Sequence, residues 1–196
     1  MNFSYNNDSG KIILEIKNLD SEFMYINSLS RGVGNNDLGL DRGQLGNSRV
    51  VYFTKRGNKI LLIQPNLRYV SNSSNYLENK AVEEAFARSV LFGFDIIEKS
   101  NDSYKIDITS FLISDAHGVS QRLKYSNSGS YTLNKSMSAI DLDRTKAFPK
   151  NIEFDVLLTF TGNPLGNLVR SVTPTASNLT VNQHHSFVEL PDNNYK

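Results

Sequence analysis

The sequence predicts a mainly β protein, either an antiparallel β sandwich or saddle-like sheets, with one or two short helices. Three observations support this fold class. Runs rich in β-branched and aromatic residues recur along the chain. Two of them flank the turn sequence KRGN around Gly57, as in an antiparallel hairpin, and apolar residues occupy every second position from Ile152 to Phe160. Such runs pack as sheets face to face or curl into a barrel.

The first part of the chain is predicted to form strands that are separated by turns and by one long loop. Residues 11–16 (KIILEI) and 23–29 (FMYINSL) are predicted strands, and residues 49–64 are a predicted hairpin. Between them, residues 30–48 are rich in glycine, asparagine and aspartate, and loops of this length tend to be functional or disordered. Pro65 has no amide hydrogen, so it is expected at a bulge or on an edge strand.

The second part mixes strands with short helical segments. Residues 71–79 are polar and predict a surface loop, and residues 79–100 predict a short helical turn that leads into a strand. Residues 103–108 (SYKIDI) alternate and are the expected hairpin partner of that strand. Thr109 or Ser110 is the expected cap of a short helix. The remaining predicted strands are 131–142, 148–162, 168–172 and 177–190.

Composition excludes several classes of protein. The 196 residues suit a single β-rich domain, 1–196, and 39% hydrophobic residues suffice for a core. The net charge is +1, from 21 basic and 20 acidic residues, so no nucleic-acid partner is expected. The absence of cysteine excludes disulfides and thiolate zinc sites. No apolar run is long enough to span a membrane, and the first residues do not resemble a signal peptide.

Two adjacent histidines, His184 and His185, raise the question of a metal site. Neighbouring side chains of a strand point to opposite faces, so the pair is poorly placed to hold one ion. The chain has no H-E-x-x-H motif, and the third histidine, His117, is far away in the sequence. Metal ligands and ordinary strand or interface histidines are the two alternatives. The second is favoured, and no metal site and no catalytic residue is predicted in this chain.

The glycine-rich loop is considered as a site for two kinds of ligand, a nucleotide and a calcium ion. It lacks the lysine of a P-loop and departs from G-x-G-x-x-G at the third glycine, which argues against nucleotide binding. Asp37 and Asp41 carry the oxygen ligands that calcium prefers, but the EF-hand spacing is missing. A turn-rich loop held by its own hydrogen bonds is the simpler interpretation.

Several segments together resemble a known bacterial family. The most specific are GLDRGQLG (39–46) and AFPKN (147–151), and the resemblance extends from about Gly10 to Tyr195. In order and spacing the segments resemble the N-terminal region of the large zinc-dependent metallopeptidases of Bacteroidetes and their relatives, a region described as a domain of unknown function. The resemblance implies a non-catalytic domain that packs on a separate catalytic domain, which carries H-E-x-x-H and the zinc. No cofactor is therefore expected in residues 1–196.

The resemblance also implies partners and a location. The expected partners are the catalytic domain of the same polypeptide and its peptide substrate, and the parent protein is expected to be periplasmic or secreted. Asp37, Asp41, Arg42 and Gln44 are expected either to face the substrate cleft or interface, or to form a mobile loop tip. His184 and His185 are expected in a strand that leads to the next domain.

Two other functions are open. The first is a free-standing module that binds peptide or glycan on an exposed sheet edge, with Pro65 marking a second, protected edge. The other is a complete enzyme, which has the least support from the sequence.

Overall fold

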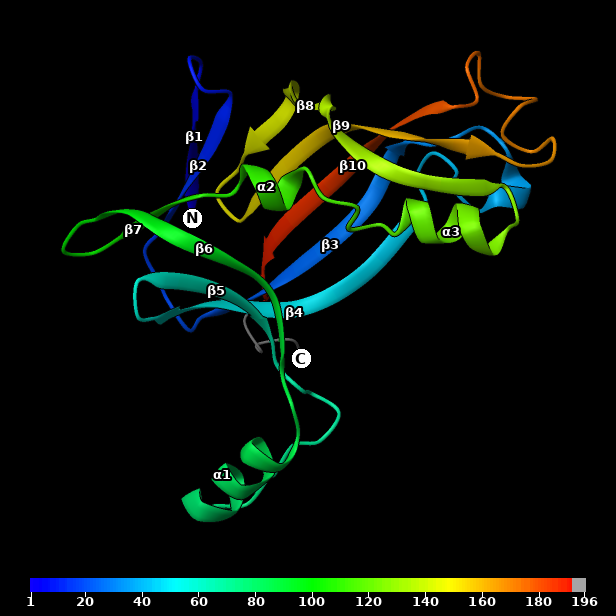
Figure 1. The fold of residues 1–196 in the computed structure, drawn as a ribbon. Coiled ribbons are helices and arrows are strands. Elements are labelled where there is room, and N and C mark those ends of the chain that lie inside the picture. Colours follow the sequence, from blue (N-terminus) through cyan, green and yellow to red (C-terminus); the bar gives the residue numbers. More distant parts are fainter. Residues whose placement is uncertain (192–196) are drawn as a thin grey trace.

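A computed structural model describes residues 1–191 of the chain. The ten strands of this part form one antiparallel sheet, which curls until it is nearly closed like a barrel (Figure 1). Across the sheet the order is β1-β2-β7-β6-β5-β4-β3-β10-β9-β8. The predicted class, mainly β and antiparallel with short helices, is confirmed.

The elements have the following bounds. The strands are β1 (Asn2–Asn6), β2 (Lys11–Ile16), β3 (Glu22–Arg31), β4 (Leu45–Arg56), β5 (Lys59–Gln64), β6 (Ser89–Lys99), β7 (Tyr104–Asp107), β8 (Gly129–Ala147), β9 (Asn151–Pro164) and β10 (Asn178–Glu189). The helices within residues 1–191 are α1 (Tyr76–Ala85), α2 (Thr109–Leu112), α3 (Val119–Tyr125) and the 3-10 turn η1 (Asn36–Leu38).

The core lies on the inner face of the curled sheet. The predicted stripe of β9, from Ile152 to Phe160 at every second residue, is at most 3% exposed. Aromatic rings fill the centre: the ring centroids of Phe23 and Phe53 are 5.3 Å apart, and those of Phe23 and Phe187 are also 5.3 Å apart. The helix α2 adds Phe111 to this cluster. Period-two patterning therefore identified the buried face of β9.

The hairpin of β4 and β5 is confirmed, and Gly57 at its turn has a left-handed φ of 58°. The predicted strand 168–172 is wrong. Its segment forms local turns, in which the carbonyl of Val169 accepts from the amides of Val172 and Thr173 at 3.2 and 3.1 Å. Local hydrogen bonds of this kind replace the ladder that a strand requires.

The expectation that Pro65 lies at a bulge or on an edge strand is wrong. Pro65 lies just past the end of β5, and β5 pairs with β4 on one side and with β6 on the other, so it is not an edge strand. The register shift of β5 against β6 lies between Leu62 and Ile63, before Pro65. The missing amide hydrogen of Pro65 ends the ladder instead of marking an edge. The true edges of the described sheet are β1 and β8.

Three local assignments also differ from the prediction. Residues 2–6, for which no strand was predicted, form β1 and pair with β2. The predicted loop 71–79 contains the start of α1, whose first turn is capped by the Asn75 side chain at 2.9 Å from the Leu77 amide. Thr109 is not a cap but the first helical residue of α2, and its hydroxyl accepts from the Ile12 amide.

The centre of the sheet joins segments that are far apart in the sequence. β3 lies between β4 and β10, with Phe23 opposite both Val51 and Glu189. The segment 65–88, here called the arm, connects β5 to β6. It carries α1, which extends away from the barrel (Figure 1). No residue of α1 is buried.

Candidate functional site

The two adjacent histidines lie in the interior of the sheet, in β10, between β3 and β9. Their side chains point to opposite faces, as strand geometry requires. His185 is completely buried on the inner face. The side chain of His184 is 26% exposed on the outer face. The two rings therefore have separate surroundings, which decide their chemistry independently.

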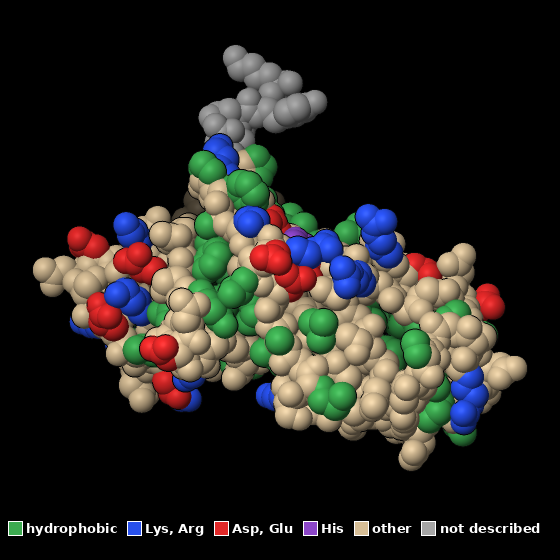
Figure 2. Space-filling model, turned by 90° about the horizontal axis from the view of Figure 1, so that it is seen from above, with side chains coloured by type: hydrophobic (Ala, Val, Ile, Leu, Met, Phe, Trp, Pro, Cys, Tyr) green, Lys and Arg blue, Asp and Glu red, His purple; other side chains and the backbone are tan. Residues whose placement is uncertain are grey.

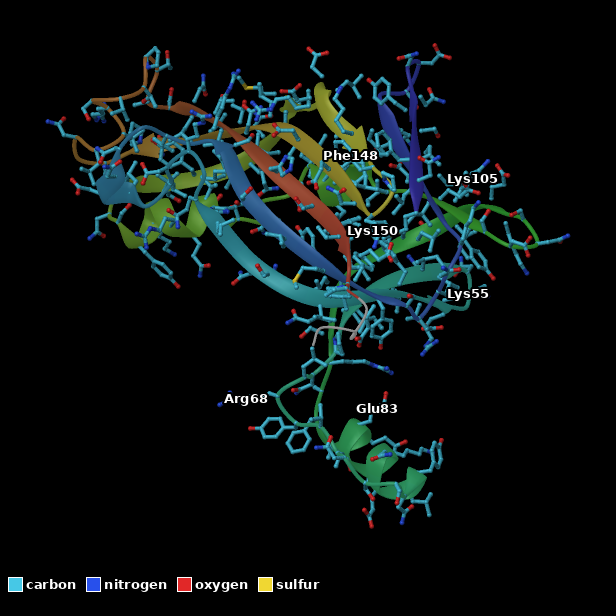
Figure 3. All side chains as sticks on the ribbon, turned by 180° about the vertical axis from the view of Figure 1, so that it is seen from behind. Lys55, Arg68, Glu83, Lys105, Phe148 and Lys150 are labelled. Atoms are coloured by element: carbon cyan, nitrogen blue, oxygen red, sulfur yellow. The ribbon has the colours of Figure 1, made fainter. Side chains whose placement is uncertain are left out.

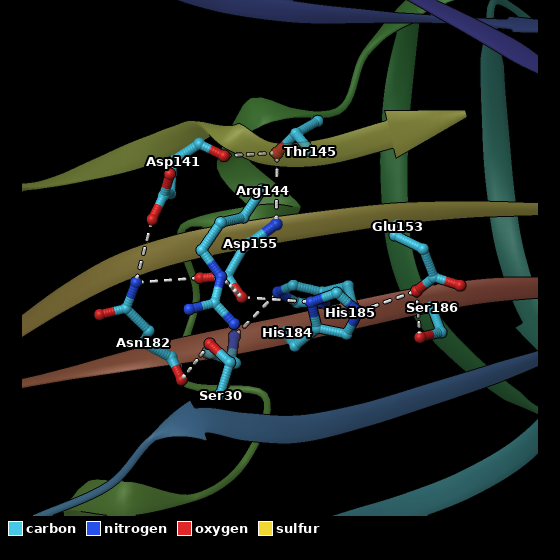
Figure 4. Close-up of polar contacts among 11 residues, drawn as sticks. Ser30, Asp141, Arg144, Thr145, Glu153, Asp155, Asn182, His184, His185 and Ser186 are labelled. Atoms are coloured by element: carbon cyan, nitrogen blue, oxygen red, sulfur yellow. Dashed lines mark hydrogen bonds and ion pairs between the residues drawn. The ribbon is translucent and has the colours of Figure 1, made fainter. Parts of the chain in front are cut away.

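His184 is held between two carboxylates of β9 (Figure 4). Its Nε2 lies 2.8 Å from Glu153 Oε2 and its Nδ1 lies 3.2 Å from Asp155 Oδ2. These hydrogen bonds, to Asp155 first and then to Glu153, raise the pKa of His184 to about 9. Burial raises the pKa of both carboxylates, but the hydrogen bonds from His184 and from their other donors, together with the nearby positive charges, outweigh burial, so both pKa values are lowered. At neutral pH the imidazole is a cation that donates from both nitrogens.

Asp155 is the buried centre of this group, with a side chain that is 0% exposed. Asn182 Nδ2 donates to Asp155 Oδ1 at 2.9 Å, and Arg144 Nε lies 3.5 Å from Oδ2. A buried carboxylate is tolerated when its charge is compensated and its oxygens are hydrogen-bonded. The face shown in Figure 2 has histidine surface among acidic and basic side chains. We call Glu153, Asp155, Asn182, His184 and Arg144 the outer polar cluster; it connects β8, β9 and β10.

The outer polar cluster does not have the geometry of a metal site. Glu153 and Asp155 bind opposite nitrogens of His184, so the three groups do not converge on one point. A doubly donating imidazole also has no lone pair for a metal or for base catalysis. Within residues 1–191 no group of three or more histidine, aspartate or glutamate side chains is placed to hold a metal ion. The described residues therefore do not fit a zinc ion.

His185 takes part in a second network, inside the barrel. Its Nδ1 lies 2.9 Å from Tyr25 Oη, and its Nε2 lies 3.1 Å from the Leu112 carbonyl and 2.9 Å from Gln183 Nε2. Either neutral tautomer is satisfied, because each one donates one of these bonds and accepts another. Burial lowers the pKa of His185 to about 4. The ring is therefore neutral at physiological pH.

The inner network fixes the segment between α2 and α3. Gln183 Nε2 donates to the Ser114 carbonyl at 2.9 Å, and Gln183 Oε1 accepts from the His117 amide at 2.8 Å. Asn27 Nδ2 donates to the Ala116 carbonyl at 2.7 Å. The third histidine is thus brought next to β10, which nothing in the sequence indicated. It comes close through its backbone, and its ring does not contact either of the other two imidazoles by a hydrogen bond.

The glycine-rich loop is packed against the barrel. The Leu29 amide donates to the Gln44 carbonyl at 2.9 Å, and the Val33 amide donates to the Leu40 carbonyl at 2.8 Å. Leu38 and Leu40 are at most 1% exposed. Arg122 of α3 donates from Nε to the Leu38 carbonyl at 2.6 Å. The loop is therefore a folded excursion between β3 and β4, anchored by two leucines and by α3.

The four predicted loop residues lie on the outside of this excursion. Asp37, Arg42 and Gln44 are exposed and Asp41 is half-buried. No ion pair joins Asp41 to Arg42 in the described part of the chain. Gln44 lines a shallow open pocket of about 320 Å³ together with residues of α3 and the segment before it. The structure does not bring these residues to the outer polar cluster through any hydrogen bond or ion pair.

The arm is a surface that was not predicted from the sequence. Tyr76 and Leu77 at the start of α1 are 71% and 70% exposed. Tyr69 and Phe86 stack on each other with ring centroids 4.0 Å apart, which closes the base of the arm. Figure 3 shows Arg68 and Glu83 on the same segment, below the barrel. The apolar positions of residues 82–90 were visible in the sequence, but their exposure was not.

A family model described as a domain of unknown function (DUF5117) matches residues 43–196. The chain belongs to this family. No curated protein and no solved structure matches the chain. The DUF5117 match begins after β3, although β3 pairs with β4 and β10 inside the sheet. The folded unit is therefore larger than the matched segment and includes β1, β2 and β3.

The comparison supports the predicted domain of unknown function and says nothing of a peptidase. Within residues 1–191 no helix of this DUF5117 chain has the length and apolar character needed to cross a membrane. Part of the segment HHSFVELPDNNY, which contributed to the resemblance, lies beyond the described residues.

Proposed function

We propose that this DUF5117 chain is the non-catalytic accessory domain of a zinc-dependent metallopeptidase and packs on the catalytic domain of the same polypeptide through its arm. The observation that carries the proposal is the exposure of the arm. Its apolar side chains are large and mostly uncovered: Leu67 54%, Tyr69 46%, Val70 63%, Tyr76 71%, Leu77 70%, Phe86 38%.

α1 has ten residues and none of them is buried, and a helix of this length with little tertiary packing is only marginally stable in water. Several large exposed apolar side chains on one segment are typical of protein interaction sites. Burial of one large apolar side chain contributes about 1.5–3 kcal/mol. Covering Tyr76 and Leu77 with a partner would therefore stabilise both the helix and the complex.

The place where β10 ends supports a partner in the same polypeptide. Glu189, the last residue of β10, is opposite Phe23 of β3, and Phe23 is opposite Val51 of β4 on its other side. Tyr52, the next residue of β4, is opposite Ile63, close to the point where β5 leads into the arm. A domain joined on the C-terminal side of β10 would thus begin at the end of the sheet from which the arm extends.

In this proposal the zinc belongs to the catalytic domain, because the described residues of this chain do not fit it. The loop residues Asp37, Asp41, Arg42 and Gln44 are the candidates for contact with the substrate cleft or with its peptide. This assignment is supported by the structure of the loop, which is packed against the barrel and presents polar side chains at its surface.

Hydrogen exchange of the full polypeptide tests the docking of the arm. The amides of residues 66–88 should exchange more slowly in the full polypeptide than in the 196-residue chain, and the pair Tyr76→Ser and Leu77→Ser should remove the difference. Tyr125→Ser on α3 is the matched control, since Tyr125 is also 71% exposed. Equal exchange in both proteins contradicts the proposal, and so does a reading frame without a downstream H-E-x-x-H motif.

The contribution of the loop to the cleft has a separate test. Arg42→Ala in the full polypeptide should lower peptidase activity, while the melting temperature of the 196-residue chain stays nearly the same because Arg42 is exposed. Unchanged activity would remove the loop from the cleft and leave the docking of the arm standing.

The alternative, a module that binds peptide or glycan on a sheet edge, has less support. β1 is only five residues long. β8 has register shifts between Asn134 and Ala139 and between Asp141 and Lys146. Hydroxyls of Ser138 and Thr145 bond to backbone carbonyls of β8 itself. Short and bulged edges of this kind discourage the addition of a strand.

A further inference from the structure

A pocket with a volume of about 300 Å³ lies at one end of the barrel. Lys17 in the turn between β2 and β3 and Glu22 at the start of β3 form one wall, and the turn between β8 and β9 forms the other, with Phe148 and Lys150. The second turn contains the AFPKN segment and is closed by a hydrogen bond from the Phe148 amide to the Asn151 carbonyl at 2.8 Å. The open ends of β-barrels are frequent ligand sites, and this volume is at the lower limit for small ligands.

The floor of this barrel-end pocket is aromatic. Phe23, Phe53 and Phe187 line it and belong to the packed core. Phe148 lines the pocket from the turn between β8 and β9, where Figure 3 labels it with Lys150, and it is 51% exposed. Aromatic rings gain from offset or edge-to-face contacts with one another. The floor and Phe148 together suit an aromatic group inserted between them.

Charges of both signs surround the aromatic floor. Lys17 and Lys150 carry positive charge, and Glu22 and Glu189 carry negative charge. Among residues 1–191 none of the four forms an ion pair. A ligand with only one kind of charge would face two repelling groups, whereas a zwitterion can place each of its charges beside an opposite one.

We propose that the barrel-end pocket binds a short zwitterionic peptide through an aromatic side chain. The aromatic ring packs on Phe23 and Phe187 and against Phe148. The terminal carboxylate faces Lys17 and Lys150, and the terminal ammonium faces Glu22 and Glu189. This binding site is independent of the arm and of the proposed accessory role, because every residue that forms it belongs to this chain.

Titration calorimetry of the 196-residue chain with the dipeptide Ala-Phe tests the site. Ala-Phe should bind, and Phe148→Ala should weaken it about tenfold, which corresponds to about 1.4 kcal/mol. Lys150→Ala should also weaken it. The matched controls Phe86→Ala on the arm and Lys55→Ala on β4 change an exposed ring and a lysine outside the pocket, and they should leave the affinity unchanged.

Ligand variants complete the test. Ala-Ala, which lacks the ring, and Ala-Phe blocked by N-acetylation and C-amidation, which lacks both charges, should bind at least about tenfold more weakly than Ala-Phe. Equal affinity for any of these, or no binding of Ala-Phe at all, would overturn the proposal. Binding of maltotriose without binding of Ala-Phe would also overturn it, in favour of a glycan site. Phe86, Phe148 and Lys150 are exposed and Lys55 is half-buried, so circular dichroism suffices to check that the variants fold.

Discussion

His184 and His185 are adjacent in β10, yet one is a cation between two carboxylates on the outer face and the other is a neutral ring beside Tyr25 in the core. Their pKa values are moved in opposite directions, to about 9 and about 4. Protonation of His184 therefore stabilises the fold, whereas protonation of His185 destabilises it. The free energy of unfolding should fall on both sides of a maximum near pH 6.5.

The alkaline side of this maximum is assigned to His184. Its folded-state pKa lies above the ordinary value of 6.5, so its contribution is fully present below about pH 6.5 and is lost as the pH rises through about 9. The loss is on the order of 2 to 3 kcal/mol. Urea unfolding from pH 6.5 to 9 should show this decrease in the natural chain and almost none in His184→Gln.

The His184→Gln variant should also be less stable at pH 6.5, because Asp155 stays buried with one partner fewer. His117→Gln is the control, since burial lowers the pKa of His117 and so moves its titration away from the alkaline range. A decrease above pH 6.5 that is as large in His184→Gln as in the natural chain would disprove the assignment.

The acid side is assigned first to His185. Its folded-state pKa is below the ordinary value, so its contribution is present above about pH 6.5 and is lost as the pH falls toward 4. His185→Gln should be less stable than the natural chain by about 1–3 kcal/mol at pH 7, because the contacts to Tyr25 and Leu112 are disturbed. Between pH 6.5 and 5, the variant should lose less stability than the natural chain.

Urea midpoints at the two pH values measure this difference. Glu153 and Asp155 have lowered pKa values, so they add a loss of stability only below their ordinary values, at a pH under about 4.5. The range from pH 6.5 to 5 therefore separates His185 from the carboxylates. An equal loss in variant and natural chain over this range would argue against His185.

Gly46 is required for a steric reason. A Cβ at this position would lie 1.7 Å from Asn27 Oδ1 and 3.0 Å from His117 Nδ1, both of which are buried and have no hydrogen-bond partner among residues 1–191. Gly46→Ala should destabilise the chain by about 1–3 kcal/mol through overpacking. Thermal unfolding in the Asn27→Ala background is the check, because removal of Oδ1 should reduce the cost of the added methyl group. An equal cost in both backgrounds would contradict this explanation.

The segment 43–196 matched by the family model should not fold alone. Without β3, the strands β4 and β10 lose their common partner, and the core loses the rings of Phe23 and Tyr25. The expected result is a truncated chain without a cooperative thermal transition and without dispersed amide resonances. A well-dispersed spectrum from residues 43–196 would show that the first three strands are dispensable.

Regular patterns in the sequence predicted the fold class, the β4–β5 hairpin and the buried face of β9, because alternation in a strand is a local property. Segment 168–172 was misjudged because apolar Val169 is buried in a turn, and burial alone does not distinguish a turn from a strand. Pro65 was misplaced because strand order, which decides what is an edge, depends on pairings between distant segments.

The candidate sites were less predictable than the fold. The opposite faces of His184 and His185 followed from strand geometry alone. Their charge states did not, because they depend on Glu153 and Asp155 in one case and on Tyr25 in the other, some 30 or 160 positions away. The barrel-end pocket also combines residues of two turns that only the closed sheet brings together.

The position of β10 between β3 and β9 has a consequence for synthesis of the protein. β3 leaves the ribosome early but must wait for β10, more than 145 residues later, before its second edge is paired. Until then the nascent chain exposes two unpaired strand edges and part of an aromatic core. Such long-range closure is slow and prone to aggregation, so this chain should depend strongly on chaperones during translation.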